Sequence, residues 1–161
     1  MASTQKNLSH VSIPNLSKIG TVKIAILVSH WNEKVTYALR DGAIETLVNA
    51  GILKENIQVN YVPGTFELTL GAQLFCEKQN HAVICLGCVI QGETPHFTFI
   101  CDAVANGIMN LNIKYKLPVI FGVLTTSTQQ QAEERSGGKH GNKGIEAAAA
   151  ALQMIALKQS W

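Results

Sequence analysis

The chain has 161 residues, of which 47% are hydrophobic and 15% are charged, and its formal net charge at pH 7 is +2. This length is typical of one domain with a sizeable core, and its lysines and arginines form no basic stripe with aromatic residues, which argues against a nucleic acid partner. No apolar run reaches the roughly 18 to 20 residues that a membrane span needs, so we expect no membrane partner.

The first segment, residues 1–18, is polar and irregular and is interrupted by Pro14. We predict that it is an N-terminal arm, either disordered or contributing an extra strand to a neighbour, and that residues 19–161 form a single α/β domain. Because residues 1–10 lack the apolar centre of a secretory signal, we expect a cytoplasmic protein.

In the rest of the chain, strand-length aliphatic runs alternate with helical patterns. Asn32 is placed to cap the first helix and Gly51 to end it. This alternation predicts an α/β fold, a three-layer αβα sandwich with a four-stranded parallel sheet and doubly wound, flavodoxin-like connections. We predict strands over 22–28, 57–62, 81–90 and 119–125, and helices over 33–50, 67–79, 95–116, 129–135 and 144–158.

The turns that follow the strands of a parallel sheet meet at its carboxyl edge, where ligands bind. Two of these turns carry the aromatic residues Trp31 and Phe66. Their rings can stack on a flat ligand, although packing in the core would explain either residue equally well. Thr65 and Glu67 can form hydrogen bonds beside them. We therefore predict a site for a small, polar, partly aromatic ligand at this edge.

The turn after the third strand leads directly into a long helix. Thr94 is suited to the N-cap and Pro95 to the first helical position. A helix N-terminus favours an anion such as phosphate, here beside Glu93 and Thr94. His96, in the first turn, carries the side-chain type whose unperturbed pKa lies close to neutrality, which makes it a candidate for proton transfer. An ordinary helix start remains the alternative explanation.

The segment 135–144 contains four glycines and three cationic side chains. Such a loop can bring Arg135 and Lys143 to an anion, and it can also be no more than flexible surface. Neither the phosphate-loop spacing nor the Rossmann glycine pattern is present.

The cysteines fall in predicted strands and helices, as small buried hydrophobic residues do. Cys85 and Cys88 have C-x-x-C spacing but no second pair and no clustered histidine. We therefore predict packing rather than metal binding or redox chemistry for them.

Five blocks of sequence together resemble the 6,7-dimethyl-8-ribityllumazine synthase family of riboflavin biosynthesis, and the resemblance extends over residues 20–158. In the family's order, the blocks are VPGTFE (62–67), VIQGET with HF (89–97), PVIFGVLTT (118–126), QAEER (131–135) and GNKG (141–144).

The resemblance implies an enzyme, a transferase that works with neither a metal nor an organic cofactor. Members condense 5-amino-6-(D-ribitylamino)uracil with 3,4-dihydroxy-2-butanone 4-phosphate and release phosphate and water. The pyrimidine amine attacks the ketone to form an imine, phosphate is eliminated, and the ribitylamino nitrogen then closes the second ring.

Carried over by position, the resemblance implies that Trp31 stacks on the pyrimidine and that His96 is the proton donor. Arg135 would clamp the phosphate and Lys143 would approach the pyrimidine. The backbone N–H groups of Glu93 and Thr94 would bind the phosphate. The remaining substrate-binding positions would hold the ribityl chain and the ring: Thr65, Phe66, Glu67, the backbone of Cys88, Val89 and Ile90, and Phe121 of a neighbouring subunit.

The resemblance also implies a homopentamer with sites between adjacent subunits, and in many members twelve pentamers form a 60-subunit icosahedral shell. The apolar composition agrees with a homo-oligomer, and the short 135–144 segment favours the 60-mer, since members that stop at the pentamer often lengthen it. Riboflavin synthase is a further expected partner. The rival hypotheses are a non-enzymatic lumazine or flavin carrier and an unrelated nucleotide binder; the presence of His96, Arg135 and Lys143 together favours the enzyme.

Overall fold

The computed structural model describes residue 7 and residues 9–161. Each long element lies within three residues of its predicted bounds. The strands are β1 (Ile24–Ser29), β2 (Ile57–Val62), β3 (Ala82–Ile90), β4 (Val119–Thr126), β5 (Ser136–Gly138) and β6 (Gly141–Asn142). The helices are α1 (Glu33–Asn49), α2 (Leu68–Cys76), α3 (His96–Tyr115), α4 (Gln129–Glu134) and α5 (Lys143–Gln159), with 3-10 turns at Ile19–Thr21 and Lys54–Asn56.

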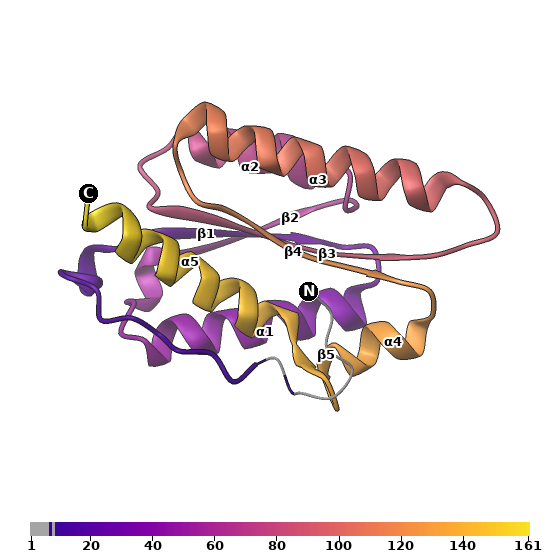
Figure 1. Cartoon of the computed structure of the whole chain (residues 1–161), viewed down its shortest axis with the longest axis horizontal. Helices are drawn as coiled ribbons and strands as arrows, with labels where there is room; N and C mark the ends of the chain where they lie inside the picture. Colours follow the sequence, from indigo (N-terminus) through magenta and orange to yellow (C-terminus); the bar gives the residue numbers. More distant parts are fainter. Residues whose placement is uncertain (1–6, 8) are drawn as a thin grey trace.

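Within the described residues, the four long strands form one parallel sheet in the order β2-β1-β3-β4. Helices α2 and α3 cover one face of this sheet, and α1, α4 and α5 cover the other (Figure 1). The predicted three-layer αβα architecture is therefore confirmed. None of the helices in residues 9–161 is both long and apolar enough to cross a membrane.

The central strands are apolar on both faces, which explains their place in the sheet. Every residue of β1 is buried, and β3 is buried from Ala82 to Cys88. On one face these strands pack against Leu39 of α1 and Leu152 of α5, and on the other against Leu68 of α2. Strands covered on both faces have continuous aliphatic sequences, and this is the pattern that made them predictable.

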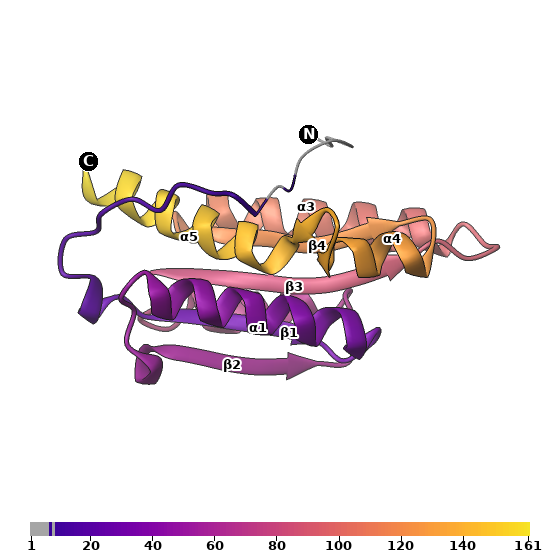
Figure 2. The same cartoon turned by 90° about the horizontal axis from the view of Figure 1, so that it is seen from below.

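The parallel strands bring their following turns to one edge of the sheet. Figure 2 shows β2 and β3 pointing in the same direction, toward that edge. The strands do not end level, however: β1 pairs with β3 only as far as Val28 opposite Leu86, whereas β4 pairs with β3 as far as Thr126 opposite Ile90. The end of β3 therefore projects beyond β1 and is open on that side.

Asn32 is confirmed as the N-cap residue of α1, whereas the start of α3 differs from its prediction. Asn32 occupies the N-cap position of α1 in the left-handed region (φ 62°), but its side chain makes no capping hydrogen bond. Helix α3 has Pro95 at its N-cap, again without a side-chain cap, so the prediction that Thr94 caps this helix is wrong. The physical reason is that the carbonyl of Pro95, not that of Thr94, accepts the first helical hydrogen bond, from the N–H of Thr98 at 3.0 Å.

The predicted end of α1 at Gly51 is confirmed. Gly51 has φ 100° and donates its N–H to the carbonyl of Val48 at 2.9 Å, and Ile52 donates to the carbonyl of Leu47 at 3.1 Å. A residue in this left-handed conformation is most easily glycine, which has no Cβ.

The described part of the arm runs along α5 (Figure 2). Gln153 donates to the carbonyl of Ser12 at 2.9 Å, and Ser17 donates to Gln159 at 3.0 Å. Residues 7 and 9–18 form no strand in this single chain, and the rest of the predicted arm lies outside the described residues.

Gly144 provides a test of the packing between α1 and α5, because a Cβ at this position would overlap the carbonyl oxygen of Leu39. We expect Gly144→Ala to lower the free energy of unfolding by about 3 kcal/mol or more, since the backbone of one helix must move. Urea unfolding measures the change, with Gly92→Ala as the control, where a Cβ meets no atom within 4 Å. A loss for Gly144→Ala no larger than that of the control would contradict the tight contact.

Candidate functional site

A cavity of about 580 Å³ opens at the carboxyl edge of the sheet. This volume is within the range of small-molecule sites. Its walls come from the turns after β1 and β2, the projecting end of β3 and the start of α3. The lining residues are Trp31, Asn32, Gly64, Thr65, Phe66, Glu67, Cys88, Val89, Ile90, His96 and Ile100.

The turn after β1 carries Trp31, which is 73% exposed at the cavity. Its N–H donates to the carbonyl of Pro63 at 3.1 Å, which extends the contact between the two strand ends beyond the last pair of β1 and β2. The next residue, Asn32, donates its side-chain amide to the carbonyl of Cys88 at 3.0 Å. The sequence pattern predicts a cap position for Asn32 but not this role in the cavity wall; asparagine's tolerance of positive φ was the available signal.

The turn after β2 supplies the opposite wall. Thr65 is buried, and its hydroxyl lies 3.5 Å from the carbonyl of Cys88. Phe66 is 54% exposed. The carboxylate of Glu67 accepts the N–H of Gly64 at 2.9 Å, which fixes this exposed acidic group at the rim of the cavity. These three predicted residues are therefore brought together as expected, with an aromatic face between two hydrogen-bonding groups.

The end of β3 forms the floor. Gln91 donates its N–H to the carbonyl of Thr126 on β4, so by the alternation of a strand the peptide groups of Cys88 and Ile90 face away from β4, toward the side that β1 leaves open. Burial raises the pKa of the Cys88 thiol to about 11. At neutral pH this residue is therefore a neutral thiol that can serve the site through its backbone and not as a thiolate nucleophile.

His96 is the first residue of α3, and its exposed side chain lines the cavity. Glu93 and Thr94 are exposed in the turn before the helix and are not among the lining residues. The α3 start thus places an imidazole at the cavity and leaves the predicted phosphate-binding N–H groups just outside its lining.

The segment predicted as a glycine-rich loop is an antiparallel hairpin of β5 and β6, which pairs Ser136 with Asn142. Gly137 and Gly141 allow its turns, with φ 126° and 88°. The hairpin joins α4 to α5 and holds Arg135 at its start and Lys143 just after its end. The structure therefore contains a paired hairpin at this segment.

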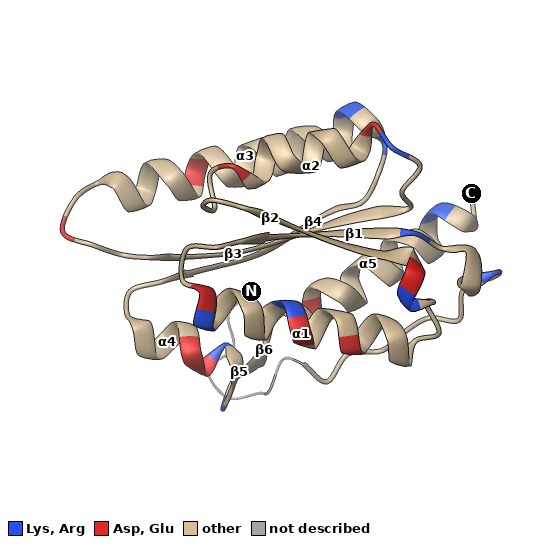
Figure 3. Cartoon of the chain, turned by 180° about the vertical axis from the view of Figure 1, so that it is seen from behind, with Lys and Arg blue, Asp and Glu red and all other residues tan. Residues whose placement is uncertain are grey.

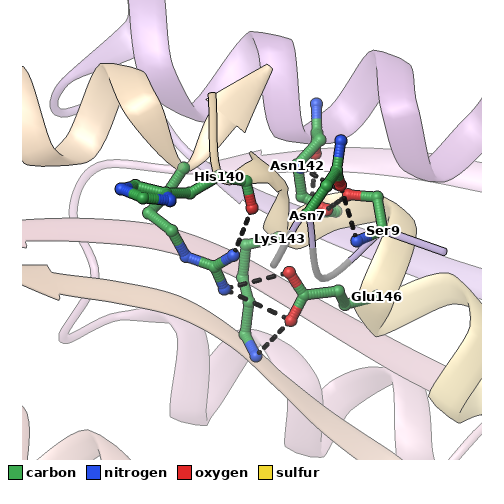
Figure 4. A network of polar contacts seen from close by, with 8 residues as sticks. Asn7, Ser9, His140, Asn142, Lys143 and Glu146 are labelled. Carbon is green, nitrogen blue, oxygen red and sulfur yellow. Dashed lines mark hydrogen bonds and ion pairs between the residues drawn. The ribbon is translucent and has the colours of Figure 1, made fainter. Parts of the chain in front are cut away.

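Arg135 and Lys143 share a single carboxylate, that of Glu146 (Figure 4). The guanidinium of Arg135 lies 2.9 Å from Glu146 and donates to the carbonyl of His140 at 2.8 Å, and the ammonium of Lys143 lies 3.2 Å from Glu146. Glu146 was not predicted from the sequence. Its position three residues after Lys143 on one helix face was the signal that could have found it.

Besides Glu93 and Thr94, three predicted site residues do not line the cavity of their own chain. Arg135 and Lys143 belong to the hairpin and the start of α5. Phe121 is on β4 and packs against the cluster between the sheet and the α2–α3 layer. Within one chain the predicted residues thus fall into two groups, one around the cavity and one away from it. Over the described residues, no group of three or more His, Cys, Asp or Glu side chains could hold a metal ion.

The sequence was compared with known proteins. A family model described as 6,7-dimethyl-8-ribityllumazine synthase matches residues 21–159. A relative of that name from Cytophaga hutchinsonii is 57% identical over 159 residues, covering 97% of this chain and 98% of the relative. A relative of the same name from Porphyromonas gingivalis is 49% identical over 160 residues, which cover 99% of each chain. Another, from Parabacteroides distasonis, is 47% identical over 156 residues, which cover 96% of this chain and 98% of the relative.

The shared carboxylate makes a testable contribution to stability. Side-chain exposure is 15% for Glu146 and 20% for Arg135, so Glu146→Gln leaves two partly buried cations facing each other without a counter-charge. We expect the free energy of unfolding to fall by about 1–2 kcal/mol, less than for a fully buried pair. Glu133→Gln, which removes the pair with Lys34, whose side chain is 81% exposed, is the control and should cost clearly less in the same urea titration. Equal losses for the two variants would show that burial adds nothing at Glu146.

Proposed function

The chain belongs to the 6,7-dimethyl-8-ribityllumazine synthase family, and on that basis we propose that the cavity at the carboxyl edge of the sheet is its condensation site. The protein is a transferase of riboflavin biosynthesis that joins 5-amino-6-(D-ribitylamino)uracil to 3,4-dihydroxy-2-butanone 4-phosphate. One observation supports this proposal most directly: residues from three separate segments, 31–32, 64–67 and 88–100, line a single cavity. Together they place an aromatic ring, a carboxylate, peptide groups and an imidazole around it.

The pyrimidine is proposed to stack on the exposed ring of Trp31. The peptide groups of Cys88 and Ile90, which face the open side at the end of β3, would hold its polar edge with Val89 between them, because a heterocycle with adjacent donors and acceptors matches the N–H and carbonyl groups of an unpaired strand. Thr65, Phe66 and Glu67 would bind the ribityl chain.

His96 is the proposed proton donor. The condensation moves protons at several steps: the amine that attacks the ketone loses both of its protons, the ketone oxygen gains two and leaves as water, and elimination of phosphate follows. An imidazole is suited to these transfers because its ordinary pKa is close to neutrality. Its place at the start of α3 also puts it beside Glu93 and Thr94, the proposed phosphate-binding residues. Holding both substrates in one cavity would supply much of the remaining rate enhancement.

We further propose that Phe121, Arg135 and Lys143 of an adjacent subunit complete the cavity. Arg135 would bind the phosphate of the butanone, in competition with Glu146, and Lys143 would approach the pyrimidine. A carboxylate that pairs with both cations in the single chain keeps them close together until a doubly charged phosphate competes for the guanidinium.

The homo-oligomer has support in the α2–α3 layer. Figure 3 shows these helices free of charged residues over most of their length. Large apolar side chains are exposed on the same helices: Leu70 (64%), Leu74 (52%), Phe99 (71%), Met109 (51%) and Ile113 (70%). Exposed apolar surface of this extent is typical of subunit interfaces.

The proposed assembly is a pentamer, with the 60-subunit shell favoured because only residues 135–142 separate α4 from α5. Analytical ultracentrifugation separates the two particles. Residues 1–18 would be the arm and residues 19–161 the domain of each subunit. The cytoplasm is the proposed location, with riboflavin synthase, which uses the product, as a proposed partner.

His96→Ala tests the proton donor. We expect the single-turnover rate of lumazine formation, followed by fluorescence, to fall by about 10²-fold without reaching zero, because positioning of the substrates remains. His10→Ala, in the arm, is the control. A loss below about threefold would remove His96 from this role, and a protein with no lumazine formation even before mutation would favour the carrier hypothesis.

Mixed oligomers test the shared site. Arg135→Ala alone should raise the KM for the butanone phosphate by about tenfold, the effect of losing one charge-assisted contact. When His96→Ala and Arg135→Ala chains are unfolded and refolded together, about a quarter of the sites combine an intact His96 with an intact Arg135 from the next subunit, and activity should recover in that proportion. Co-refolding each variant with itself is the control. Failure to recover activity in correctly assembled mixtures would place both residues in one subunit's site.

A further inference from the structure

Trp31 is held in place by its backbone and its neighbours. It is 73% exposed. In the part of the chain that the structure describes, the ring pairs are formed by His30, Tyr37 and Tyr61 and do not include Trp31. An exposed side chain outside these ring pairs takes its direction largely from the turn that carries it, so the residues that fix this turn determine where the ring lies.

His30 fixes the turn on one side. Its ring is stacked on Tyr61 of β2, with centroids 5.0 Å apart and planes 14° apart, and its Nδ1 lies 2.9 Å from the hydroxyl of Tyr37 on α1. Its backbone N–H also donates to the carbonyl of Val62 at 2.9 Å. The residue immediately before Trp31 is thus tied to both a neighbouring strand and a neighbouring helix.

Arg40 holds the two tyrosines that His30 contacts. Its guanidinium donates to the hydroxyl of Tyr61 at 2.7 Å and lies 4.6 Å from the ring centre of Tyr37. Asp41 in turn accepts from the Nε of Arg40 at 2.7 Å. Because the cation contacts the ring of one tyrosine and the hydroxyl of the other, the tyrosines form a fixed surface rather than two independent side chains.

Asn32 fixes the turn on the other side. Its backbone is in the left-handed region, which is costly for most residues other than glycine, and its amide donates to the carbonyl of Cys88 on β3 at 3.0 Å. This bond links the Trp31 turn to the strand whose peptide groups are proposed to bind the pyrimidine. It therefore sets the distance between the stacking ring and the polar wall.

We propose that His30 and Asn32 are positioning residues for the condensation, which hold the Trp31 ring over the cavity before the pyrimidine arrives. The inference rests on the proposed role of Trp31 in stacking. With the turn fixed, the pyrimidine enters a preformed slot between the ring and the end of β3; without it, binding must first order the ring. The affinity for the pyrimidine depends on this arrangement, whereas the affinity for the butanone phosphate does not.

The test uses a background in which Trp31 is the only tryptophan. The chain has two tryptophans, and Trp161 is 99% exposed at the carboxyl end, so Trp161→Phe provides this background. Asn32→Gly keeps the positive φ accessible and removes the amide, and Tyr37→Phe removes only the hydroxyl that contacts His30. Glu33→Gln, in the first turn of α1, is the matched control. Circular dichroism and thermal unfolding identify any variant that does not fold.

Time-resolved fluorescence anisotropy of Trp31 in the protein without substrate should show faster nanosecond motion in Asn32→Gly and Tyr37→Phe than in Glu33→Gln. In the same variants the KM for the pyrimidine should rise by about fivefold or more, with the KM for the butanone phosphate within about twofold of the control. Unchanged anisotropy in both variants overturns the proposal, as does faster motion with an unchanged KM for the pyrimidine. Trp31→Ala tests the stacking separately: an unchanged KM there refutes the proposed function of Trp31, whatever the anisotropy shows.

Discussion

The candidate site depends on the unequal length of two neighbouring strands. Because β1 stops pairing with β3 at Leu86, the carbonyl of Cys88 faces a space that no strand fills, and it is instead reached by the amide of Asn32 and the hydroxyl of Thr65. Two turns that are far apart in the sequence are thereby attached to one peptide group. Were β1 two residues longer, its backbone would satisfy this carbonyl and occupy the floor of the cavity.

The sequence was sufficient for the fold and for most of the cavity because both follow from regular patterns. Strands buried on both faces are continuous aliphatic runs, and the carboxyl ends of parallel strands must meet at one edge, so the sequence alone places Trp31, Thr65 and His96 at that edge. The contributions of Asn32 and Glu146 could not be predicted in this way, since they depend on single contacts. The partner of Asn32 is a carbonyl 56 residues away, and Glu146 acts through the packing of a hairpin onto a helix.

Thr94 illustrates the same limit at a helix start. Threonine followed by proline is a favourable start, but which residue becomes the cap depends on the backbone torsions of the turn that leaves β3. In the structure Pro95 has the helical conformation and accepts the first hydrogen bonds, so the helix begins at His96. The shift of one residue matters for function, because it makes the histidine the first helical residue at the rim of the cavity.

The N-terminal arm also contacts the segment that carries the cationic group, by which we mean Arg135 and Lys143. The hydroxyl of Ser9 accepts the N–H of Asn142 at 2.6 Å, and the side chain of Asn142 caps α5 by accepting the N–H of Gly144. Lys143 lies between those two residues. A purification tag or a fusion partner joined to the amino end can therefore disturb the hydrogen bond that holds the backbone next to Lys143. One joined after the fully exposed Trp161 is not attached to that contact. An attachment after Trp161 leaves the contact between Ser9 and Asn142 undisturbed.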